Sequence, residues 1–156
     1  MTDIVDKETR SRMMSGIRAK NTKPEIFIRH ALHTRGFRYR LHRKDLPGKP
    51  DIVLPRYNAV IFVNGCFWHG HGCRLFKWPK TRADFWHTKI SGNKERDRSN
   101  TDALLAQGWR VFIVWECALK GVRSDARVVM LEDLFGWIKS DNHFDETPEQ
   151  HLLARN

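Results

Sequence analysis

The spacing of apolar and polar residues predicts two helices at the start of the chain. Residues 6–20 are basic, and their apolar side chains recur at helical spacing. A second helix is expected to begin at Thr22, because the segment from Thr22 to Glu25 reads Thr-Lys-Pro-Glu, which fits a capping box with proline in the first turn. This helix should end at Gly36, since glycine is favoured just past a helix C-terminus.

The pattern then changes to the two-residue period of β-strands. In residues 37–42 apolar and basic side chains alternate, which predicts a half-exposed strand with a basic face. A turn rich in proline and glycine separates it from a short predicted strand at residues 51–54. Residues 59–63 are continuously apolar, which is typical of a central strand buried on both faces, and residues 109–115 predict another buried strand.

Helices and one unusual loop complete the predicted elements. Residues 64–82 are rich in Gly, Cys, His and Trp and are expected to form a structured loop. Helices are predicted at residues 83–90 and 93–107, and a last amphipathic helix at residues 125–140. The side chains of this last helix that should face inward are Val128, Leu131, Leu134, Phe135 and Ile138.

These elements indicate one α/β domain over residues 1–156, in which helices flank a small mixed sheet. The expected order is α-α-β-β-β-α-β-α. Residues 1–20 are interpreted as an N-terminal helix or arm, and residues 141–156 as a polar, mobile tail.

The charge of the chain narrows the class of partner. Its 28 Lys and Arg against 18 Asp and Glu give a formal net charge of +10, and such a surface attracts polyanions, most commonly nucleic acid. A basic but inert surface is the alternative. The hydrophobic content of 40% argues against disorder. No apolar run approaches the ~20 residues of a membrane span, and no apolar stretch resembles a signal peptide, so a cytoplasmic protein is expected.

Three cysteines and neighbouring histidines suggest a metal site. Cys66 and Cys73 bracket His71 in the glycine-rich loop, and Cys117 follows a predicted buried strand. Three thiolates and one imidazole form a common tetrahedral set for structural zinc. His69 is an alternative fourth ligand that the spacing does not exclude. The competing interpretation is that Cys117 is a buried apolar thiol and the loop binds no metal.

An acidic residue and a histidine lie near two predicted strand ends. Asp51 opens one strand, and the strand at residues 59–63 ends close to His69. A hard cation such as Mg²⁺ binds carboxylate oxygens, and a nearby histidine could take a proton from water attacking phosphorus. Such a site would hydrolyse a phosphodiester. Alternatively, Asp51 is only a turn residue and Glu25 only caps its helix.

Aromatic residues beside basic ones suggest contacts with DNA bases. Trp68 lies in the Cys/His loop and Trp86 among Lys and Arg residues, and apolar side chains inserted between base steps can deform DNA. Core packing is the alternative for both. Core packing is expected for Trp109, Trp115 and Trp137, which lie on predicted core elements.

Together these residues carry a resemblance to a known family. Over about residues 5–140 the chain resembles the very short patch repair endonucleases. The motif Gly-Cys-Phe-Trp-His at residues 65–69 and the motif Trp-Glu-Cys at residues 115–117 are the most specific features. The other supporting segments are residues 6–14, 46–51, 85–86, 93–97 and 108–111.

The resemblance implies a core like that of type II restriction endonucleases. It also implies a Mg²⁺-dependent nick on the 5′ side of the thymine in a T:G mismatch, which arises when 5-methylcytosine deaminates. By the same resemblance, Asp51 and the main-chain oxygen of Val63 bind Mg²⁺. His69 is then the general base, Asp97 orients it, and Glu25 holds metal-bound water.

The resemblance further implies the zinc ligands, the DNA contacts and the partners. The zinc ligands are Cys66, His71, Cys73 and Cys117, which decides between the two histidines. The residues that wedge into DNA beside the mismatch are Phe67, Trp68 and Trp86, with Met14 of the DNA-contacting N-terminal helix in support. The expected substrate is double-stranded DNA with a T:G mismatch, bound by a monomer. Mismatch-repair proteins and a cytosine-5 methyltransferase are candidate protein partners.

Two departures from related nucleases affect the interpretation. The wider superfamily pairs its Asp with an acid-x-Lys triplet on the next strand, whereas residues 61–64 read Ile-Phe-Val-Asn, a lack that the repair family shares. Asn64 stands where some relatives are expected to have His, and a neutral amide cannot take a proton, so more weight falls on His69. The alternatives are a zinc-stabilised DNA-binding module without catalysis and a nuclease of the same fold that ignores mismatches.

Overall fold

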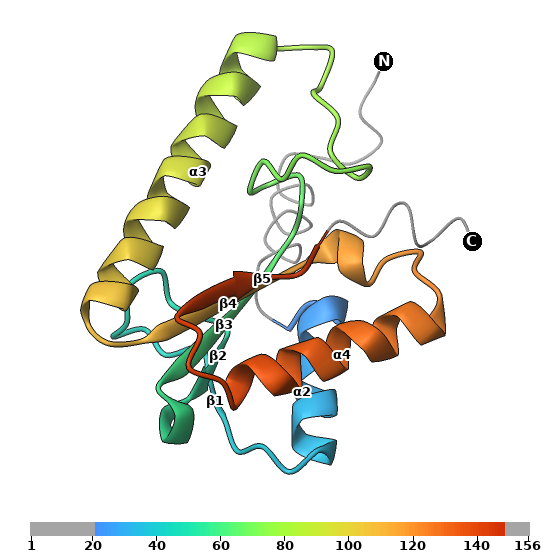
Figure 1. Cartoon of the computed structure of the whole chain (residues 1–156). Coiled ribbons are helices and arrows are strands. Elements are labelled where there is room, and N and C mark those ends of the chain that lie inside the picture. Colours follow the sequence, from blue (N-terminus) through green and yellow to red (C-terminus); the bar gives the residue numbers. More distant parts are fainter. Residues whose placement is uncertain (1–20, 149–156) are drawn as a thin grey trace.

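The structure is a computed structural model that describes residues 21–148 (Figure 1). In this range the chain forms a five-stranded sheet in the order β1-β2-β3-β4-β5, flanked by α-helices. The helices are α2 (Lys23–Thr34), α3 (Ala83–Ala106) and α4 (Ser124–Ile138). The strands are β1 (Arg40–Leu41), β2 (Ile52–Leu54), β3 (Ala59–Asn64), β4 (Arg110–Trp115) and β5 (Phe144–Glu146). The helix predicted at residues 6–20, together with Met14, lies outside the described residues.

The pairing of the strands brings three chain segments to one edge of the sheet. β1–β2 and β2–β3 are antiparallel, whereas β3–β4 and β4–β5 are parallel, with α3 and α4 as the crossover helices. The C-terminal ends of β3 and β4 therefore meet at the same edge, and the start of the antiparallel β2 lies there as well. This mixed sheet with flanking helices is consistent with the restriction-endonuclease-like core that the family resemblance implies.

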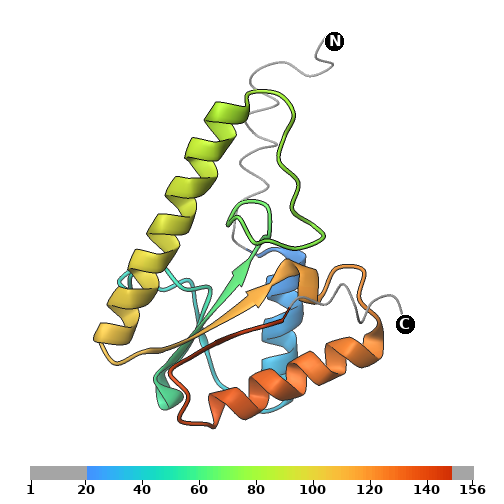
Figure 2. The same cartoon turned by 45° about the horizontal axis from the view of Figure 1, so that its top comes forward.

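Helices cover both faces of the sheet (Figure 2). Successive residues of β3 face opposite sides of the sheet. Ile61 packs in one core with Ile28 of α2 and Leu134 of α4. Val60 packs in a second core with Leu104 of α3. Only the C-terminal part of α3 lies against the sheet. Its N-terminal part extends beyond the sheet, beside the loop that follows β3 (Figure 1).

The predicted capping of α2 is confirmed, with one shift. Thr22 Oγ1 accepts a hydrogen bond from the Glu25 main-chain N–H at 3.3 Å, as in a capping box. The Glu25 carboxylate returns to the N–H of Asn21 at 3.1 Å rather than to that of Thr22. Gly36 follows the last turn with a φ of +94°, the left-handed conformation that glycine adopts without strain.

Two helix predictions are wrong in detail. The segments predicted as separate helices at 83–90 and 93–107 form the single helix α3, because the Ser91-Gly92 pair costs only about 1 kcal/mol of helix propensity and does not break it. In α4, Val128 is exposed rather than buried. Met130 and Trp137 are buried instead, so the inward face of the helix does not include Val128.

The two ends of the sheet also differ from the prediction. Residues 37–42 do not form one strand: only Arg40–Leu41 pair with β2, because the Phe37 ring turns into the core against Phe135. The segment predicted as a mobile tail contributes β5, which pairs with β4, and Thr147 Oγ1 accepts a hydrogen bond from the Trp115 main-chain N–H at 2.9 Å. Within residues 21–148, none of the helices is long and apolar enough to cross a membrane.

Candidate active site

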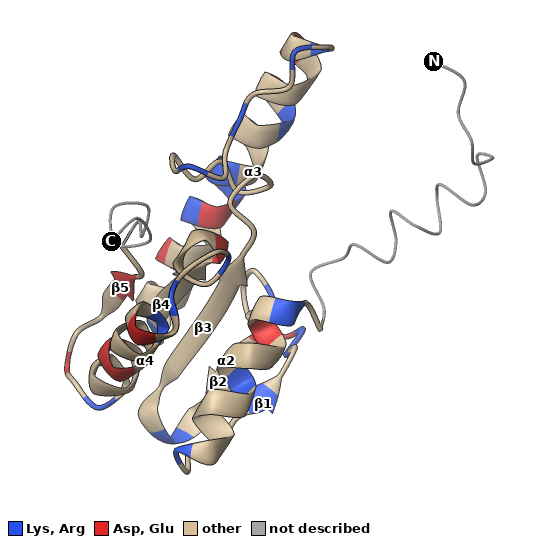
Figure 3. Ribbon diagram, turned by 90° about the vertical axis from the view of Figure 1, so that its right-hand side faces the viewer, with Lys and Arg blue, Asp and Glu red and all other residues tan. Residues whose placement is uncertain are grey.

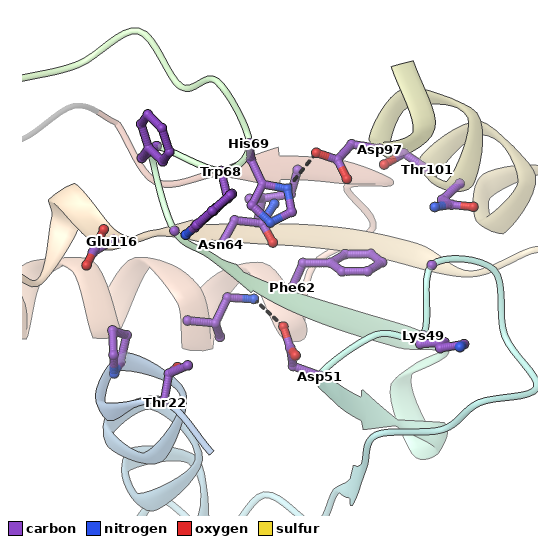
Figure 4. A pocket seen from close by; sticks show the side chains of 17 residues that line it. Thr22, Lys49, Asp51, Phe62, Asn64, Trp68, His69, Asp97, Thr101 and Glu116 are labelled. Carbon is purple, nitrogen blue, oxygen red and sulfur yellow. Dashed lines mark hydrogen bonds and ion pairs between the residues drawn. The ribbon is translucent and has the colours of Figure 1, made fainter. Parts of the chain in front are cut away.

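A pocket of about 510 Å³ opens at the edge of the sheet where β3 and β4 end (Figure 4). Its wall includes Asp51 at the start of β2, His69 from the loop after β3, and Asp97 from α3. The fold thus collects predicted catalytic side chains from three separate segments in one cavity. Glu25 is fully buried beside Asp51 and belongs to the layer behind the pocket wall.

Asp51 is held by the neighbouring strand. The antiparallel register of β2 and β3 sets Asp51 beside the end of β3, where the Val63 main-chain N–H donates a hydrogen bond to Asp51 Oδ2 at 2.8 Å (Figure 4). Burial, reinforced by the nearby charge of Glu25, outweighs this bond and raises the pKa of Asp51 to about 7. A buried acid pair without sufficient compensating charge suits a divalent cation, so these residues fit the predicted Mg²⁺ site.

Glu25 is the buried centre of a polar cluster. His42 Nε2 lies 3.0 Å from Glu25 Oε1 and 3.2 Å from Oε2, and Arg29 donates to Oε2 at 3.2 Å. Ligand atoms of Glu25, His42 and Asp51 all lie within 4.8 Å of one another, close enough to hold one metal ion. Glu25 therefore does more than cap its helix, because its carboxylate also contacts His42 and Arg29.

His69 and Asp97 form a close pair across the pocket. His69 Nδ1 lies 2.6 Å from Asp97 Oδ2, although the two residues come from different elements (Figure 4). A carboxylate at Nδ1 favours the tautomer that carries its proton there, which leaves Nε2 as the proton acceptor. Asp97 therefore lies within hydrogen-bonding distance of His69, and its orienting role stays a prediction.

The loop that carries His69 is fastened to α3. Asn93 Nδ2 donates a hydrogen bond to the Trp68 main-chain oxygen at 2.9 Å. Gly70 has a φ of +64°, and a Cβ at this position would lie 2.7 Å from Ile90 Cγ2. Only glycine permits both the left-handed backbone and this close approach. The direction of His69 therefore depends on the contact between the loop and the helix.

The three cysteines and His71 form a second candidate metal site. Their ligand atoms lie within 4.8 Å of one another, and the structure selects His71, not His69, for this cluster. All three cysteines are free thiols. The hydrogen bond from Cys66 lowers the pKa of Cys117 to about 6, which favours the thiolate, the form that binds metals. The cluster can hold a metal ion, and its donor set fits zinc.

Aromatic rings continue from the pocket along the N-terminal part of α3. Phe67 and Trp68 line the pocket, and the Trp86 ring lies 5.3 Å from Phe67 and 5.9 Å from Trp68. These three predicted wedge residues therefore form one partly exposed cluster. Trp115 and Trp137 are buried, as predicted.

Basic residues are concentrated in the loop before α3 (Figure 3). Lys77, Lys80 and Arg82 lie in this loop, and Lys89 follows in the N-terminal part of α3, whereas α3 as a whole carries four basic and four acidic residues. Acidic residues mark α4 and β5. The aromatic cluster and the pocket opening thus lie beside the basic elements, the side that a polyanion would approach.

Sequence reasoning missed His42 and Arg29. In the sequence, His42 is only one more basic position in an alternating segment. Its role depends on the β1–β2 pairing, which aligns Leu41 with Ile52 and so brings the next residue against Asp51. Arg29 could have been found, because it lies one helical turn after Glu25 and can form an i,i+4 ion pair.

Known proteins resemble this chain over most or all of its length. The family model described as DNA mismatch endonuclease Vsr matches residues 2–75. The DNA mismatch endonuclease Vsr of Escherichia coli is 44% identical over 156 residues, covering 99% of this chain and 100% of the relative. The type II nicking enzyme V.XorIIP of Xanthomonas oryzae pv. oryzae is 55% identical over 119 residues, covering 76% of this chain and 88% of the relative. The type II nicking enzyme V.NmeAIP of Neisseria meningitidis is 49% identical over 120 residues, covering 77% of this chain and 86% of the relative.

Proposed function

We propose, from the premise that this chain belongs to the DNA mismatch endonuclease Vsr family and is an endodeoxyribonuclease, that it nicks DNA on the 5′ side of the thymine in a T:G mismatch. The proposed reaction depends on Mg²⁺ and serves the repair of deaminated 5-methylcytosine. The observation that carries this proposal is the shared pocket of Asp51, the His69–Asp97 pair and the aromatic residues Phe67 and Trp68. We expect the enzyme to act on DNA in the bacterial cytoplasm, and the candidate protein partners stay predictions.

The proposed roles follow from the surroundings of each side chain. Asp51, with the main-chain oxygen of Val63, would hold Mg²⁺, which would supply positive charge for the phosphate under attack. His69 Nε2 accepts a proton from the attacking water, and Asp97 holds the imidazole in the required tautomer and orientation. Glu25 supports the cation site from behind Asp51.

The proposed zinc ion has a structural role. Bound by Cys66, His71, Cys73 and Cys117, it would fix the loop that carries both His69 and Trp68. His71 stacks on Trp115 with ring centroids 4.1 Å apart, so the same site ties the loop to the end of β4. General base and wedge would then be mounted on one rigid element.

A nicking assay on matched duplexes tests the function. End-labelled DNA that carries T:G or T:A at one position is incubated with the protein and Mg²⁺. A single nick 5′ of the thymine only in the T:G duplex is the expected result. Equal cleavage of both duplexes would favour the mismatch-independent nuclease, and binding without any cleavage would favour the non-catalytic module.

Asp97→Asn should lower the rate of nicking, because an amide no longer fixes the proton on His69 Nδ1. A loss on the order of 10–100-fold is expected, as for partners that orient other functional histidines. The measurement is single-turnover nicking of the T:G duplex, with DNA affinity measured separately. Asp102→Asn on the same helix, exposed and outside the pocket, is the control and should act like wild type. An unchanged rate in Asp97→Asn would contradict the role.

Trp68→Ala should reduce the preference for T:G over T:A. Insertion of an aromatic ring costs less at a weak wobble pair than at a matched pair, so the ring contributes to discrimination, while phosphate contacts contribute to affinity alone. The ratio of the T:A dissociation constant to the T:G dissociation constant should fall roughly tenfold, in line with ~1–3 kcal/mol for stacking on one base. Raising the salt concentration should weaken both complexes with similar slopes.

The exposed Trp78, which does not line the pocket, gives a matched control for this measurement. Trp78→Ala should leave the ratio of the T:A to the T:G dissociation constant within about twofold of wild type, since phosphate contacts dominate at the basic surface. If Trp68→Ala kept the full ratio, the wedge assignment would be wrong.

A further inference from the structure

His42 connects the two acids of the candidate cation site. Its main-chain N–H donates a hydrogen bond to the Asp51 main-chain oxygen at 3.1 Å. Its side chain reaches the other acid, with Nε2 lying 3.0 and 3.2 Å from the two oxygens of Glu25. An N–H that approaches both oxygens of a carboxylate fixes its rotation as well as its position. One residue thus touches both members of the acid pair.

The backbone of His42 is held in an uncommon conformation. Its φ is +51°, in the left-handed region that non-glycine residues rarely adopt. Such a conformation persists only where the surroundings impose it, and it recurs at functional sites. Here it occurs directly after β1, at the residue whose imidazole lies against Glu25. This backbone strain is an observation separate from the side-chain contact.

Glu25 needs a partner on the side where His42 lies. The carboxylate is fully buried, and its Oε2 accepts from the Asn21 N–H and from Arg29, while Oε1 faces His42. A buried carboxylate beside Asp51 is repelled by the negative charge there. Without the imidazole, Glu25 could turn away from Asp51, and the cation would have to gather its ligands at the moment of binding.

We propose that His42 is a positioning residue of the nuclease site: it holds the Glu25 carboxylate toward Asp51, so that the two acids are preorganised for a divalent cation. The inference rests on the proposed cation site and adds a residue to it. His42 acts through Glu25, and its effect falls on metal affinity more than on the chemical step.

Two amide variants of the full-length protein separate side-chain contact from backbone conformation. His42→Asn tolerates the left-handed backbone but is too short to reach Glu25. His42→Gln has an amide N–H at about the reach of the imidazole Nε2 and restores a donor to Glu25. His30→Asn, on the exposed side of α2, is the control for removing a histidine. Thermal unfolding checks that each variant is folded.

Calorimetric titration with Mn²⁺ in the absence of DNA measures metal affinity directly. His42→Asn should bind Mn²⁺ about tenfold more weakly than wild type, and His42→Gln and His30→Asn should stay within about threefold. In nicking assays, His42→Asn should need about tenfold more Mg²⁺ for half-maximal rate and approach the wild-type rate at saturating Mg²⁺.

Three results would overturn the inference. Wild-type Mn²⁺ affinity in folded His42→Asn would exclude the positioning role. Nitrogen coupling to bound Mn²⁺ in pulsed electron paramagnetic resonance, lost in His42→Gln, would make His42 a direct ligand instead. A wild-type protein that binds no Mn²⁺ would refute the cation site itself, and the inference with it. The first two results leave the proposed nuclease function intact.

Discussion

Asp51→Asn should abolish nicking while leaving the affinity for a T:G duplex within a few fold of wild type. The substitution removes the negative charge that the proposed Mg²⁺ site requires, but it keeps an oxygen that can accept the Val63 N–H. The expected loss is at least about 10³-fold, since a metal ion contributes several kcal/mol to transition-state stabilisation. Single-turnover nicking and equilibrium DNA binding are the two measurements. A variant that nicks at the wild-type rate would show that Asp51 is not the metal ligand.

A second prediction concerns the stability of the same variant, and its measurement shows whether lost activity results from misfolding. The pKa of Asp51 is raised from its ordinary value of 3.8 to about 7, so its contribution to stability is fully present below pH 4 and is lost as the pH rises through 7. Asparagine does not ionise. Metal-free Asp51→Asn should therefore be more stable than wild type at pH 8, by on the order of 2–4 kcal/mol in the free energy of unfolding, and should unfold at a higher temperature. This gain should vanish near pH 4. Equal stability of both proteins at pH 8 would contradict the prediction that burying the ionised Asp51 carboxylate destabilises the folded protein.

Loss of the proposed zinc should unfold the loop after β3 and abolish nicking, even at saturating Mg²⁺. The ligands belong to two segments of the chain, the loop after β3 and Cys117 after β4, and two of them, Cys66 and Cys117, are buried in the core on the α3 side of the sheet. Removing the ion leaves the neighbouring cysteine side chains without the cation that holds them together. Structural zinc sites also contribute directly to the free energy of folding. Chelation should lower the unfolding temperature by more than about 10 °C, as expected for a loss of several kcal/mol in a domain of this size.

The two neighbouring histidines provide a matched pair for this prediction. His71→Ala should lose zinc and stability, whereas His69→Ala should keep both and lose nicking by about 10²–10⁴-fold as a missing general base. Metal content, thermal unfolding and nicking rate are measured on each variant. A folded, active protein without zinc, or zinc loss in His69→Ala but not in His71→Ala, would refute the assignment.

Local signals in the sequence predicted most of the elements but few of the contacts between them. The cap at Thr22 and the apolar runs of β3 and β4 depend on neighbouring residues alone, so they could be predicted. β5 could not, because its three residues are exposed and are held by main-chain hydrogen bonds to a strand distant in sequence. Pairing across the sheet is decided by tertiary structure and not by propensity.

In the candidate active site, too, some residues have a local sequence signal and others are found only from the tertiary structure. The Cys/His spacing and the motif around His69 are concentrated in one loop, and the family resemblance named Asp97 as its partner. His42 has no such signal, since its contact with Glu25 depends on the register of β1 against β2 and on a left-handed backbone. Residues that act across an antiparallel pair are visible only once that register is known.

The continuity of α3 has a consequence for where the DNA is cut. Trp86 near its start and Asp97 in its middle belong to one unbroken helix, and a rise of about 1.5 Å per residue sets them roughly 16 Å apart along its axis. Two helices hinged at Ser91-Gly92 would let this spacing vary. A rigid α3 instead keeps Trp86, the proposed wedge residue, at a constant offset from Asp97, the partner of the proposed general base His69. The nick would then fall at the same phosphate in every substrate, with the register of cleavage determined by the length of a helix.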